Sequence, residues 1–589
     1  MPDDENLLER VFAAVVHGKL TAAAAAHLKR WLTAPGYEEY RPVLAELIHA
    51  GTWDELEAAF WTIIPFGTAG RRGRMHRFGS ATINDRTIGE SAQALATYLI
   101  ELRGRGEVGS LRCAIAYDTR HRSRQFAELC AEIMAAAGFE VLFFDGCRAT
   151  PELAYTVRDK QCACGIMISA SHNPPSDNAI KVFWSTGGQI NAPHDAELVE
   201  RIGHVGKLGR MPFAEALATR RVRYCQAEMD GRYREVVLRQ GHHGPRTLKI
   251  LYSPLHGVGA TSVLPVLTAA GFRDIELFAP HATPDGDFPN VPGHVANPEN
   301  PQVFDTLIER AEQTGADLVL ASDPDADRIG TAARLTRGGP WRTLNGNQIG
   351  VLLADYLLQR RQEAGRLNAD DFVVTTIVST DMLRRVADGY GVRTADDLYT
   401  GFKWIGEKID ELGPEHYVFG FEEAHGYLAG DYIRDKDGAV AALLLAELAA
   451  LCASEGRTLH EQLERLYLRI GRHLEKTVPL TMPGADGMMR MQEIMRRFRS
   501  ETPTSLGGLR VEEVRDYATC TDRAPSDLLV FQLEGGNRAA VRPSGTEPKI
   551  KFYLFTMEPP ERSKNVETAE RTLKERLARL EADFLKFAT

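Results

Sequence analysis

The amino-acid sequence predicts an α/β protein built on mainly parallel sheets, with a helical segment in front. Two observations lead to this prediction. Short apolar runs end in Gly, Ser or Asp and are followed by amphipathic stretches, as after residues 111–117 and 247–252. Strands that alternate with helices form βαβ units with a mainly parallel sheet. The chain has 589 residues, which is enough for several domains rather than one core.

Residues 1–60 are predicted to be helical. Leu7, Leu8, Val11 and Phe12 recur at helical spacing, and the alanine run at 22–26 has strong helix propensity. This part carries no catalytic motif. We interpret it as a helical extension that packs on the body of the protein.

Three polar or Gly/Pro-rich stretches divide the body into four parts. They lie near residues 242–245, 345–346 and 482–484. The predicted domains are therefore 61–240, 241–345, 346–475 and 476–589, after the extension at 1–60.

The composition excludes some classes of protein. The chain has 70 Lys and Arg against 80 Asp and Glu, a net charge of -10, which argues against nucleic-acid binding but allows a local basic cleft for a small anionic substrate. An acidic start and a longest apolar stretch of only residues 439–453 predict a cytoplasmic protein without a membrane anchor. The eight cysteines lack zinc-ligand spacing, so we expect reduced, packed thiols.

The first loop that could carry out chemistry is residues 169–175, Ser-Ala-Ser-His-Asn-Pro-Pro, after an apolar strand predicted at 165–168. Its two prolines stiffen the loop. Ser171 is therefore well placed as a nucleophile or phosphate carrier, although a serine needs a base or a metal to react. A Ser/Asn turn without chemistry is the alternative.

The second loop holds Asp323, Asp325 and Asp327 directly after an apolar strand predicted at 318–321. Close carboxylates repel each other unless a cation joins them, and their oxygens suit Mg²⁺ or Ca²⁺. An EF-hand needs Gly and Glu where this loop has Arg328 and Arg334, which excludes that motif. Arg328 beside the acids indicates a phosphorylated partner. The alternative is a solvated acidic turn.

Other loops are weaker signals on their own. Residues 420–427 combine two acids with glycines and aromatics, which suits sugar hydroxyls but also ordinary surface loops. Residues 542–549, Arg-Pro-Ser-Gly-Thr-Glu-Pro-Lys, offer a phosphate cradle that differs from a Walker A loop, or a simple turn. Residues 66–73 are Gly-rich and basic, as in a phosphate-binding or a flexible loop. Residues 257–262 lack the third glycine of a dinucleotide fingerprint.

Taken in order, these loops resemble those of the α-D-phosphohexomutase superfamily, which includes phosphoglucomutases and phosphomannomutases. The resemblance runs from about Phe66 to about Tyr553. Residues 169–174 look like the family's phosphoserine loop, 323–328 like its metal loop and 542–548 like its phosphate loop. The resemblance implies four domains around a deep cleft, three of related α/β topology with mixed, mainly parallel sheets and a smaller C-terminal α+β domain.

A finer resemblance is to the phosphoglucomutase-2/phosphopentomutase type. It is carried by the helical extension and by residues 66–70, 400–405 and 420–424. Ala424 stands where many hexomutases have a serine, and His425 has no assigned role.

The resemblance implies an isomerase that interconverts a sugar 1-phosphate and a sugar 6-phosphate, with glucose as the expected sugar. The reaction would pass through phosphorylated Ser171 and a bisphosphate, so we expect one Mg²⁺ and glucose 1,6-bisphosphate as activator. Lys181 is the expected base. The implied catalytic residues are Ser171, Lys181, Arg72, Arg328 and His172. The implied metal ligands are Ser171, Asp323, Asp325 and Asp327. The implied substrate-binding residues are Thr400, Gly401, Lys403, Glu422, Ala424, Arg542, Ser544, Gly545 and Thr546.

Several alternatives stay open on the sequence. The same scaffold serves phosphopentomutases and phosphomannomutases, because specificity depends on pocket shape. A glucose 1,6-bisphosphate synthase would use the same Ser171 with an acyl-phosphate donor. A sugar-phosphate sensor would be expected to have a broken core motif, whereas Ser171, the three aspartates and Arg542 are all present. The sequence allows either a monomer or a dimer.

Overall fold

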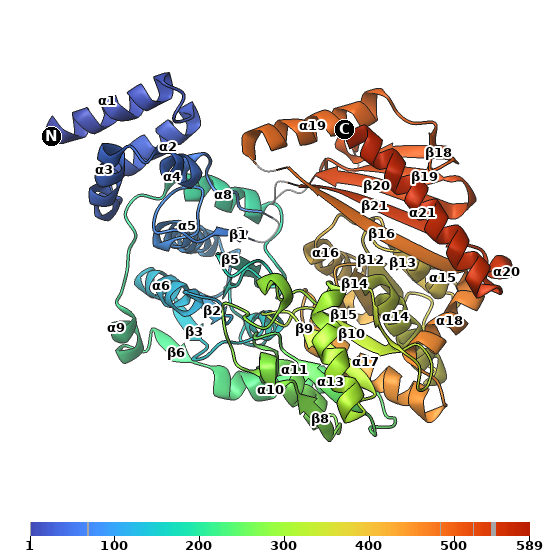
Figure 1. The fold of residues 1–589 in the computed structure, drawn as a ribbon. Coiled ribbons are helices and arrows are strands. Elements are labelled where there is room, and N and C mark those ends of the chain that lie inside the picture. Colours follow the sequence, from blue (N-terminus) through green and yellow to red (C-terminus); the bar gives the residue numbers. More distant parts are fainter. Residues whose placement is uncertain (1, 68–69, 483, 522, 544–548, 589) are drawn as a thin grey trace. The chain divides into compact units, whose positions relative to one another are not determined.

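The computed structural model describes residues 2–67, 70–482, 484–521, 523–543 and 549–588 (Figure 1). The chain divides into two compact units. The first consists of Met1–Ala332 with Gly426–Glu447, and the second of Ala333–His425 with Leu448–Thr589.

The N-terminal residues of the first unit are helical, as predicted. The Thr21 hydroxyl caps the second helix by accepting a hydrogen bond from Ala24 N at 3.1 Å. The helices share an apolar core around Trp31, whose ring centroid lies 4.8 Å from that of Tyr40 and 5.4 Å from that of Phe60. The helices are α1 (Pro2–Val16), α2 (Ala22–Thr33), η1 (Glu38–Tyr40), α3 (Arg41–Ala50) and α4 (Trp53–Phe60).

The first sheet of this unit has the strand order β1-β5-β4-β2-β3-β6. Strands β4, β2, β3 and β6 are parallel, and β5 and β1 continue the sheet antiparallel. The strands are β1 (Gly70–Arg74), β2 (Arg112–Tyr117), β3 (Glu140–Phe143), β4 (Cys164–Ile168), β5 (Asp177–Trp184) and β6 (Val222–Tyr224). The helices are α5 (Asp85–Gly104), α6 (Ser123–Ala136), α7 (Thr150–Asp159), α8 (His194–His204), α9 (Phe213–Ala218) and α10 (Gln226–Leu238).

The second sheet of this unit runs β10-β9-β7-β8, with β10 antiparallel to β9 and the others parallel. Its strands are β7 (Lys249–Ser253), β8 (Asp274–Leu277), β9 (Leu318–Ser322) and β10 (Ile329–Arg334). Its helices are α11 (Gly259–Ala269), α12 (Ala279–Ala282), η2 (Pro292–His294), η3 (Pro301–Phe304) and α13 (Asp305–Thr314). The unit also includes β15 (Gly426–Ala429) and the first part of α17 (Gly438–Ser454).

The second unit begins with three parallel strands in the order β13-β12-β14. Helix α14 starts with a capping box in which Asn345 and Gln348 bond each other's backbone N–H. The strands are β11 (Trp341–Leu344), β12 (Phe372–Thr375), β13 (Arg393–Ala395) and β14 (Tyr417–Glu422). The helices are α14 (Gly346–Glu363), α15 (Met382–Asp388), α16 (Phe402–Leu412), η4 (Pro414–His416) and α18 (Leu459–Ile470).

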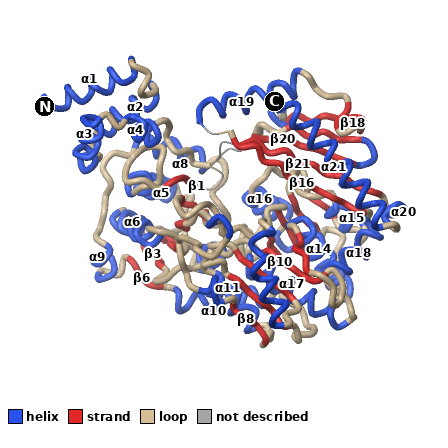
Figure 2. Tube along the Cα trace, in the orientation of Figure 1, coloured by secondary structure: helices blue, strands red, loops and turns tan. Residues whose placement is uncertain are grey.

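The C-terminal sheet is antiparallel throughout, in the order β16-β21-β20-β19-β18-β17. Figure 2 shows α21 lying along this sheet. The ring centroid of Phe584, on α21, lies 5.4 Å from that of Phe552, on β21. The strands are β16 (Arg472–Thr481), β17 (Ser505–Leu506), β18 (Leu509–Asp516), β19 (Leu529–Leu533), β20 (Asn537–Pro543) and β21 (Lys549–Glu558). The helices are α19 (Gly484–Ser500), η5 (Tyr517–Thr519), η6 (Glu534–Gly536), α20 (Pro560–Ser563) and α21 (Val566–Ala588).

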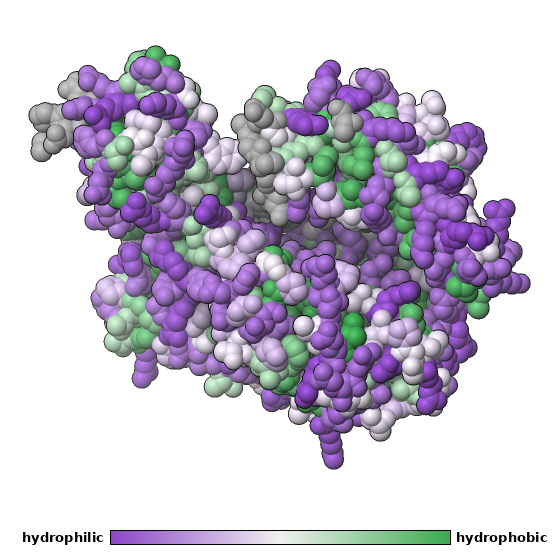
Figure 3. Space-filling view, viewed as in Figure 1, coloured by the Kyte–Doolittle hydropathy of each residue, from purple (hydrophilic) through white to green (hydrophobic). Residues whose placement is uncertain are grey.

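These elements confirm the predicted fold class of three α/β domains with mainly parallel sheets, a C-terminal α+β domain and N-terminal helices. The face in Figure 3 is mostly hydrophilic, with hydrophobic residues in scattered groups, as is usual for a protein surface. Within the described residues, no single helix is long and apolar enough to cross a membrane, and α17 with α18 passes that test only as a pair bent by 88°.

Candidate active site

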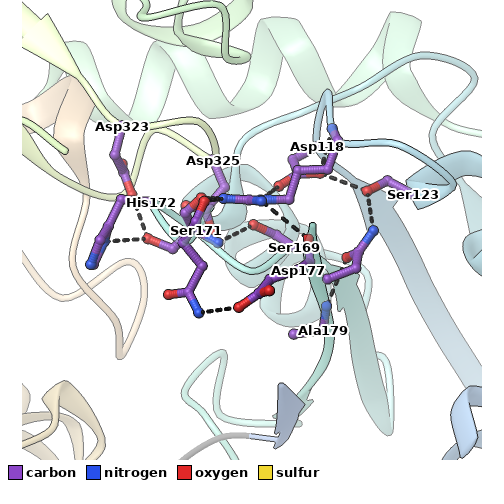
Figure 4. Close-up of polar contacts among 12 residues, drawn as sticks. Asp118, Ser123, Ser169, Ser171, His172, Asp177, Ala179, Asp323 and Asp325 are labelled. Carbon is purple, nitrogen blue, oxygen red and sulfur yellow. Dashed lines mark hydrogen bonds and ion pairs between the residues drawn. The ribbon is translucent and has the colours of Figure 1, made fainter. Parts of the chain in front are cut away.

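Ser171 lies in the loop that joins β4 to β5 (Figure 4). Its φ of +53° is a left-handed conformation, which is uncommon for a residue with a side chain. The Ser171 N–H donates to the Ser169 hydroxyl at 2.9 Å, and Ser171 is only 3% exposed. Backbone strain of this kind is tolerated where surrounding contacts hold it, and it concentrates at functional sites.

Arg120 holds this loop, although the sequence had not singled it out as a site residue. Its buried guanidinium donates to three backbone carbonyl oxygens of the loop and one at the start of β5, those of Ser171, Asn173, Pro174 and Asp177. The Asp118 carboxylate lies 3.4 Å from Arg120 Nε and supplies the opposite charge. A signal for Arg120 existed: it follows β2, the neighbour of β4, and polar residues after adjacent parallel strands meet at one sheet edge.

The three aspartates after β9 form a buried cluster. Asp323, Asp325 and Asp327 are at most 1% exposed, and one ligand oxygen from each lies within 4.8 Å of the others. The Ser171 hydroxyl donates to Asp323 Oδ2 at 2.6 Å. The predicted phosphoserine loop and the predicted metal loop therefore meet, as the close-up in Figure 4 shows for Ser171 and Asp323.

The chemistry of this cluster fits a hard divalent cation. Oδ1 of Asp325 and Oδ1 of Asp327 are buried and accept no hydrogen bond from the described residues, and the Arg328 Nε that faces the Asp327 oxygen lies 3.8 Å away. Buried carboxylate oxygens without partners are costly unless a cation or another donor satisfies them. Carboxylate oxygens are also the ligands that Mg²⁺ prefers.

Two lysines balance part of the negative charge. Lys181 Nζ, from β5, donates to Asp325 Oδ2 at 2.6 Å, and Lys436 Nζ lies 2.9 Å from Asp327 Oδ2. Lys436 was not among the residues predicted for the site, and only its spatial neighbours reveal its place. Lys181, in contrast, was predicted and lies in the cluster.

The aspartates differ in their electrostatics. Burial, and then the charges of Asp327 and Asp325, raise the pKa of Asp323 well above its usual range. Burial also disfavours the charged form of Asp325, but the charge and hydrogen bond of Lys181, together with a hydrogen bond from Thr150, outweigh it and lower the pKa of Asp325. Three buried carboxylates beside two lysines thus favour a proton or a cation at Asp323.

The remaining predicted catalytic residues of this unit lie around Ser171. Arg72 Nη1, from β1, donates to Asn173 Oδ1 at 3.3 Å, and His172 Nδ1 lies 3.3 Å from Ser171 Oγ. Burial and three nearby arginines hold the pKa of His172 well below its usual value. The Arg328 N–H donates to Asp323 Oδ1 at 3.1 Å, and its guanidinium binds Glu299. Arginines with these positions can meet a phosphoryl group.

The predicted sugar loop belongs to the second unit. Glu422 ends β14, and its Oε1 accepts a hydrogen bond from Gly401 N at 2.8 Å, so the loop before α16 and the end of β14 are joined. Gly401 has a φ of +125°, a conformation that favours glycine. Lys403 Nζ lies 5.0 Å from the centroid of the Trp404 ring. Thr400 precedes Gly401 in this loop, while Ala424 follows β14.

The second unit also contains His425 and the predicted phosphate loop. His425 is buried and has a φ of +61°. A Cβ on Gly346 would lie 1.9 Å from Glu423 O, so glycine is required where α14 approaches this loop. Arg542 lies in β20. Ser544, Gly545 and Thr546 lie outside the described residues.

Comparison with known proteins supports one family. Three protein-family models match the chain: phosphoglucomutase/phosphomannomutase α/β/α domain I at residues 64–207, domain II at 232–336 and domain III at 345–470. A phosphoglucomutase of Staphylococcus epidermidis is 35% identical over 519 residues, which cover 85% of this chain and 92% of that protein. A phosphoglucomutase of Staphylococcus aureus is 32% identical over 515 residues, covering 85% and 91%.

Solved structures agree on the fold. A putative phosphomannomutase of Thermus thermophilus superimposes with a TM-score of 0.63 at 22% identity, covering 87% of this chain and 99% of that chain. The open form of parafusin, a phosphoglucomutase of Paramecium, superimposes with a TM-score of 0.65 at 18% identity, covering 89% and 95%. The sequence matches, the shared fold and the meeting of Ser171 with the aspartate cluster lead to one conclusion: the chain belongs to the phosphoglucomutase/phosphomannomutase family of the α-D-phosphohexomutases and is a phosphosugar mutase.

Proposed function

We propose that this enzyme interconverts glucose 1-phosphate and glucose 6-phosphate through phosphorylated Ser171 and enzyme-bound glucose 1,6-bisphosphate. The observation that supports this proposal best is the 2.6 Å contact between the Ser171 hydroxyl and Asp323. It joins a strained serine to a buried carboxylate cluster that fits a cation. The similarity of the chain to two proteins named phosphoglucomutase supports glucose, rather than mannose or ribose, as the proposed sugar.

The proposed transfer has a simple bond balance. The bond between phosphorus and Ser171 Oγ breaks while the free sugar hydroxyl forms a new bond to phosphorus. Ser171 Oγ keeps the electron pair of the broken bond, and the hydroxyl proton passes to a base, for which Lys181 in its neutral amine form is the candidate. The resulting bisphosphate turns around, and its other phosphate returns to Ser171.

The residues around Ser171 have distinct proposed roles. Asp323, Asp325 and Asp327 would hold Mg²⁺ together with a phosphoserine oxygen. Bound Mg²⁺ supplies neutralisation of the negative charge on the phosphoryl oxygens. Arg72 and Arg328 orient and stabilise the moving group, because guanidinium groups pair with phosphate oxygens. His172 contacts Ser171 Oγ and orients it.

The second unit supplies the proposed recognition groups. Glu422 accepts hydrogen bonds from sugar hydroxyls, and its bond from Gly401 orients the carboxylate. Thr400, Lys403 and Ala424 line the sugar loop in this proposal. Arg542, with Ser544, Gly545 and Thr546, binds the phosphate that is not transferred.

The first prediction concerns substrate and metal. Glucose 1-phosphate, with Mg²⁺ and a trace of glucose 1,6-bisphosphate, is expected to turn over faster than mannose 1-phosphate or ribose 1-phosphate. EDTA is expected to abolish this activity and added Mg²⁺ to restore it, because a cation must neutralise the negative charge of the phosphoryl oxygens beside the aspartate cluster. Coupled detection of the 6-phosphate measures the rate, with ribose 5-phosphate followed for the pentose.

Each contrary result has a defined meaning. Turnover of ribose 1-phosphate alone would replace glucose by a pentose. Bisphosphate formation only with an acyl-phosphate donor would make the enzyme a bisphosphate synthase. Activity that survives EDTA would contradict the metal role of the aspartate cluster.

The second prediction tests Lys181 as the base. Lys181→Met and Lys181→Arg are both expected to lower kcat by about 10²–10⁴, the usual contribution of a general base. Arginine keeps the charge beside Asp325 but cannot accept the proton at working pH. Lys160→Arg, directly after α7, serves as the matched control, and its kcat should stay within about twofold of the wild-type value. Recovery of activity in Lys181→Arg would leave Lys181 only an electrostatic role.

A further inference from the structure

The pairing of β1 with β5 gives this edge of the sheet two different faces. Cross-strand partners share a face and neighbours along a strand alternate. Because Gly70 pairs with Lys181 and Arg72 pairs with Ala179, Arg72 and Lys181 lie on the face of the candidate active site. Arg71 lies on the opposite face, where it is 2% exposed.

Arg71 is held there by a dense set of acceptors. Its guanidinium donates to Glu90 Oε2 at 3.1 Å, to Thr87 O at 2.9 Å and to Ile64 O at 3.2 Å. Thr87 and Glu90 come from α5, and Ile64 precedes the Gly-rich loop. A buried guanidinium is costly unless its donors are satisfied, so this arrangement fixes the backbone of β1 next to Arg72.

Glu90 is shared between two buried arginines and a tyrosine. Its Oε1 accepts a hydrogen bond from Arg86 Nε at 2.9 Å and another from the Tyr37 hydroxyl at 2.8 Å. Glu90 is 6% exposed and Arg86 1% exposed. One carboxylate thus faces two positive charges, and each hydrogen bond that orients it matters more than it would in water.

Tyr37 belongs to the N-terminal helices rather than to the α/β domain. It precedes η1 and is 2% exposed, and the centroid of its ring lies 4.0 Å from Arg86 Cζ. Burial and the charge of Glu90 raise the pKa of Tyr37, so its hydroxyl remains a donor. The neighbouring Gly36 has a φ of +88°, and its carbonyl oxygen accepts a hydrogen bond from Arg86. A Cβ added to Gly36 would lie 2.8 Å from Gly206 O. This segment is therefore seated closely on the domain.

We propose that Tyr37 is a positioning residue for phosphoryl transfer, acting through Glu90 and Arg71 on the adjacent Arg72. The N-terminal helices then have a part in catalysis: they hold β1 in register so that the Arg72 guanidinium keeps its place near the Ser171 loop. The inference rests on the proposed role of Arg72. Displacement of a stabilising group by a fraction of an ångström is sufficient to slow a reaction that depends on orientation.

The test is Tyr37→Phe in the full chain, which removes one hydroxyl and keeps the ring. Tyr40→Phe is the matched control. Tyr40 is also buried beside Trp31, but within the described residues it forms no hydrogen bond with Glu90. Two quantities are measured: hydrogen exchange of the β1 amides at 70–74, and kcat and KM for glucose 1-phosphate. Thermal unfolding of both variants shows whether the whole domain has been weakened.

The expected result is a rise of about tenfold in β1 exchange and a fall of about 3–10-fold in kcat, with KM within about twofold, for Tyr37→Phe alone. A merely structural role would lower the unfolding temperature without this local change. Equal exchange and equal kcat in the two variants would overturn the proposal, and so would a change confined to KM. If the unmodified protein turned over none of the sugar phosphates, the proposed function would fail, whereas the exchange measurement would still test the Tyr37 contact.

Discussion

Ser171→Ala is expected to abolish mutase turnover, with a loss of at least about 10⁴-fold in kcat. The reason is chemical: without Oγ the enzyme has no atom on which to carry the phosphoryl group between the two half-reactions. The left-handed backbone at Ser171 tolerates alanine no worse than serine, so the fold should remain. The measurement is the rate of glucose 1-phosphate isomerisation, combined with mass spectrometry of the intact protein.

Ser176→Ala provides the control for this prediction. Ser176 lies in the same loop, is exposed, and donates to Asp177 rather than to the aspartate cluster. It should retain its rate within about twofold. The intact wild-type protein should show a phosphate adduct after incubation with glucose 1,6-bisphosphate, and Ser171→Ala should not. Unchanged turnover in Ser171→Ala would refute the phosphoserine mechanism as a whole.

Asp327→Asn is expected to lower activity by about 10³-fold at saturating substrate and to weaken Mg²⁺ binding. The change keeps the size of the side chain but removes one of three carboxylates whose oxygens lie within 4.8 Å of one another. A neutral amide is a poorer ligand for a hard cation. Mn²⁺ binding, followed by electron paramagnetic resonance, measures the site without relying on activity.

The same variant has a stability signature that separates metal binding from folding. In the metal-free protein, loss of one charge relieves repulsion among the buried carboxylates but also removes the ion pair with Lys436. The two effects oppose each other, so the unfolding temperature should change little. Addition of Mg²⁺ should raise the unfolding temperature of the wild-type protein, because a ligand that binds only the folded state stabilises it, and should do so much less for Asp327→Asn. Asp274→Asn, an exposed change on β8, should behave like the wild type. Equal Mn²⁺ binding in both variants would exclude the cluster as the metal site.

Much of the fold could be predicted because its signals are local. The apolar run predicted at 318–321 is β9 (Leu318–Ser322), and that at 111–117 is β2 (Arg112–Tyr117). Hydrophobic periodicity reports which residues are buried in a strand, and Gly or Pro marks where it ends. The loop chemistry of Ser171 and of the aspartates was legible for the same reason, since each motif is contiguous in the chain.

Other parts of the site had no local signal. Arg120 acts on carbonyl oxygens 51 to 57 positions away, and Lys436 meets Asp327 from a turn more than a hundred residues later. Nothing in the sequence next to Lys436 distinguishes it from a solvated lysine. The roles of these residues depend on which sheet edges and turns come together.

The sequence alone was sufficient to specify the alternation of strands and helices, the family resemblance and the two loops that carry Ser171 and the aspartates. The folded chain was needed to show that these loops touch, that two lysines share the aspartate charge, and that Tyr37 reaches Arg71 through Glu90. The physical reason is that backbone propensity and apolar burial are set by neighbouring residues along the chain. Electrostatic interactions between buried groups depend instead on distance in space and on exclusion of water, and both arise only when distant segments pack together.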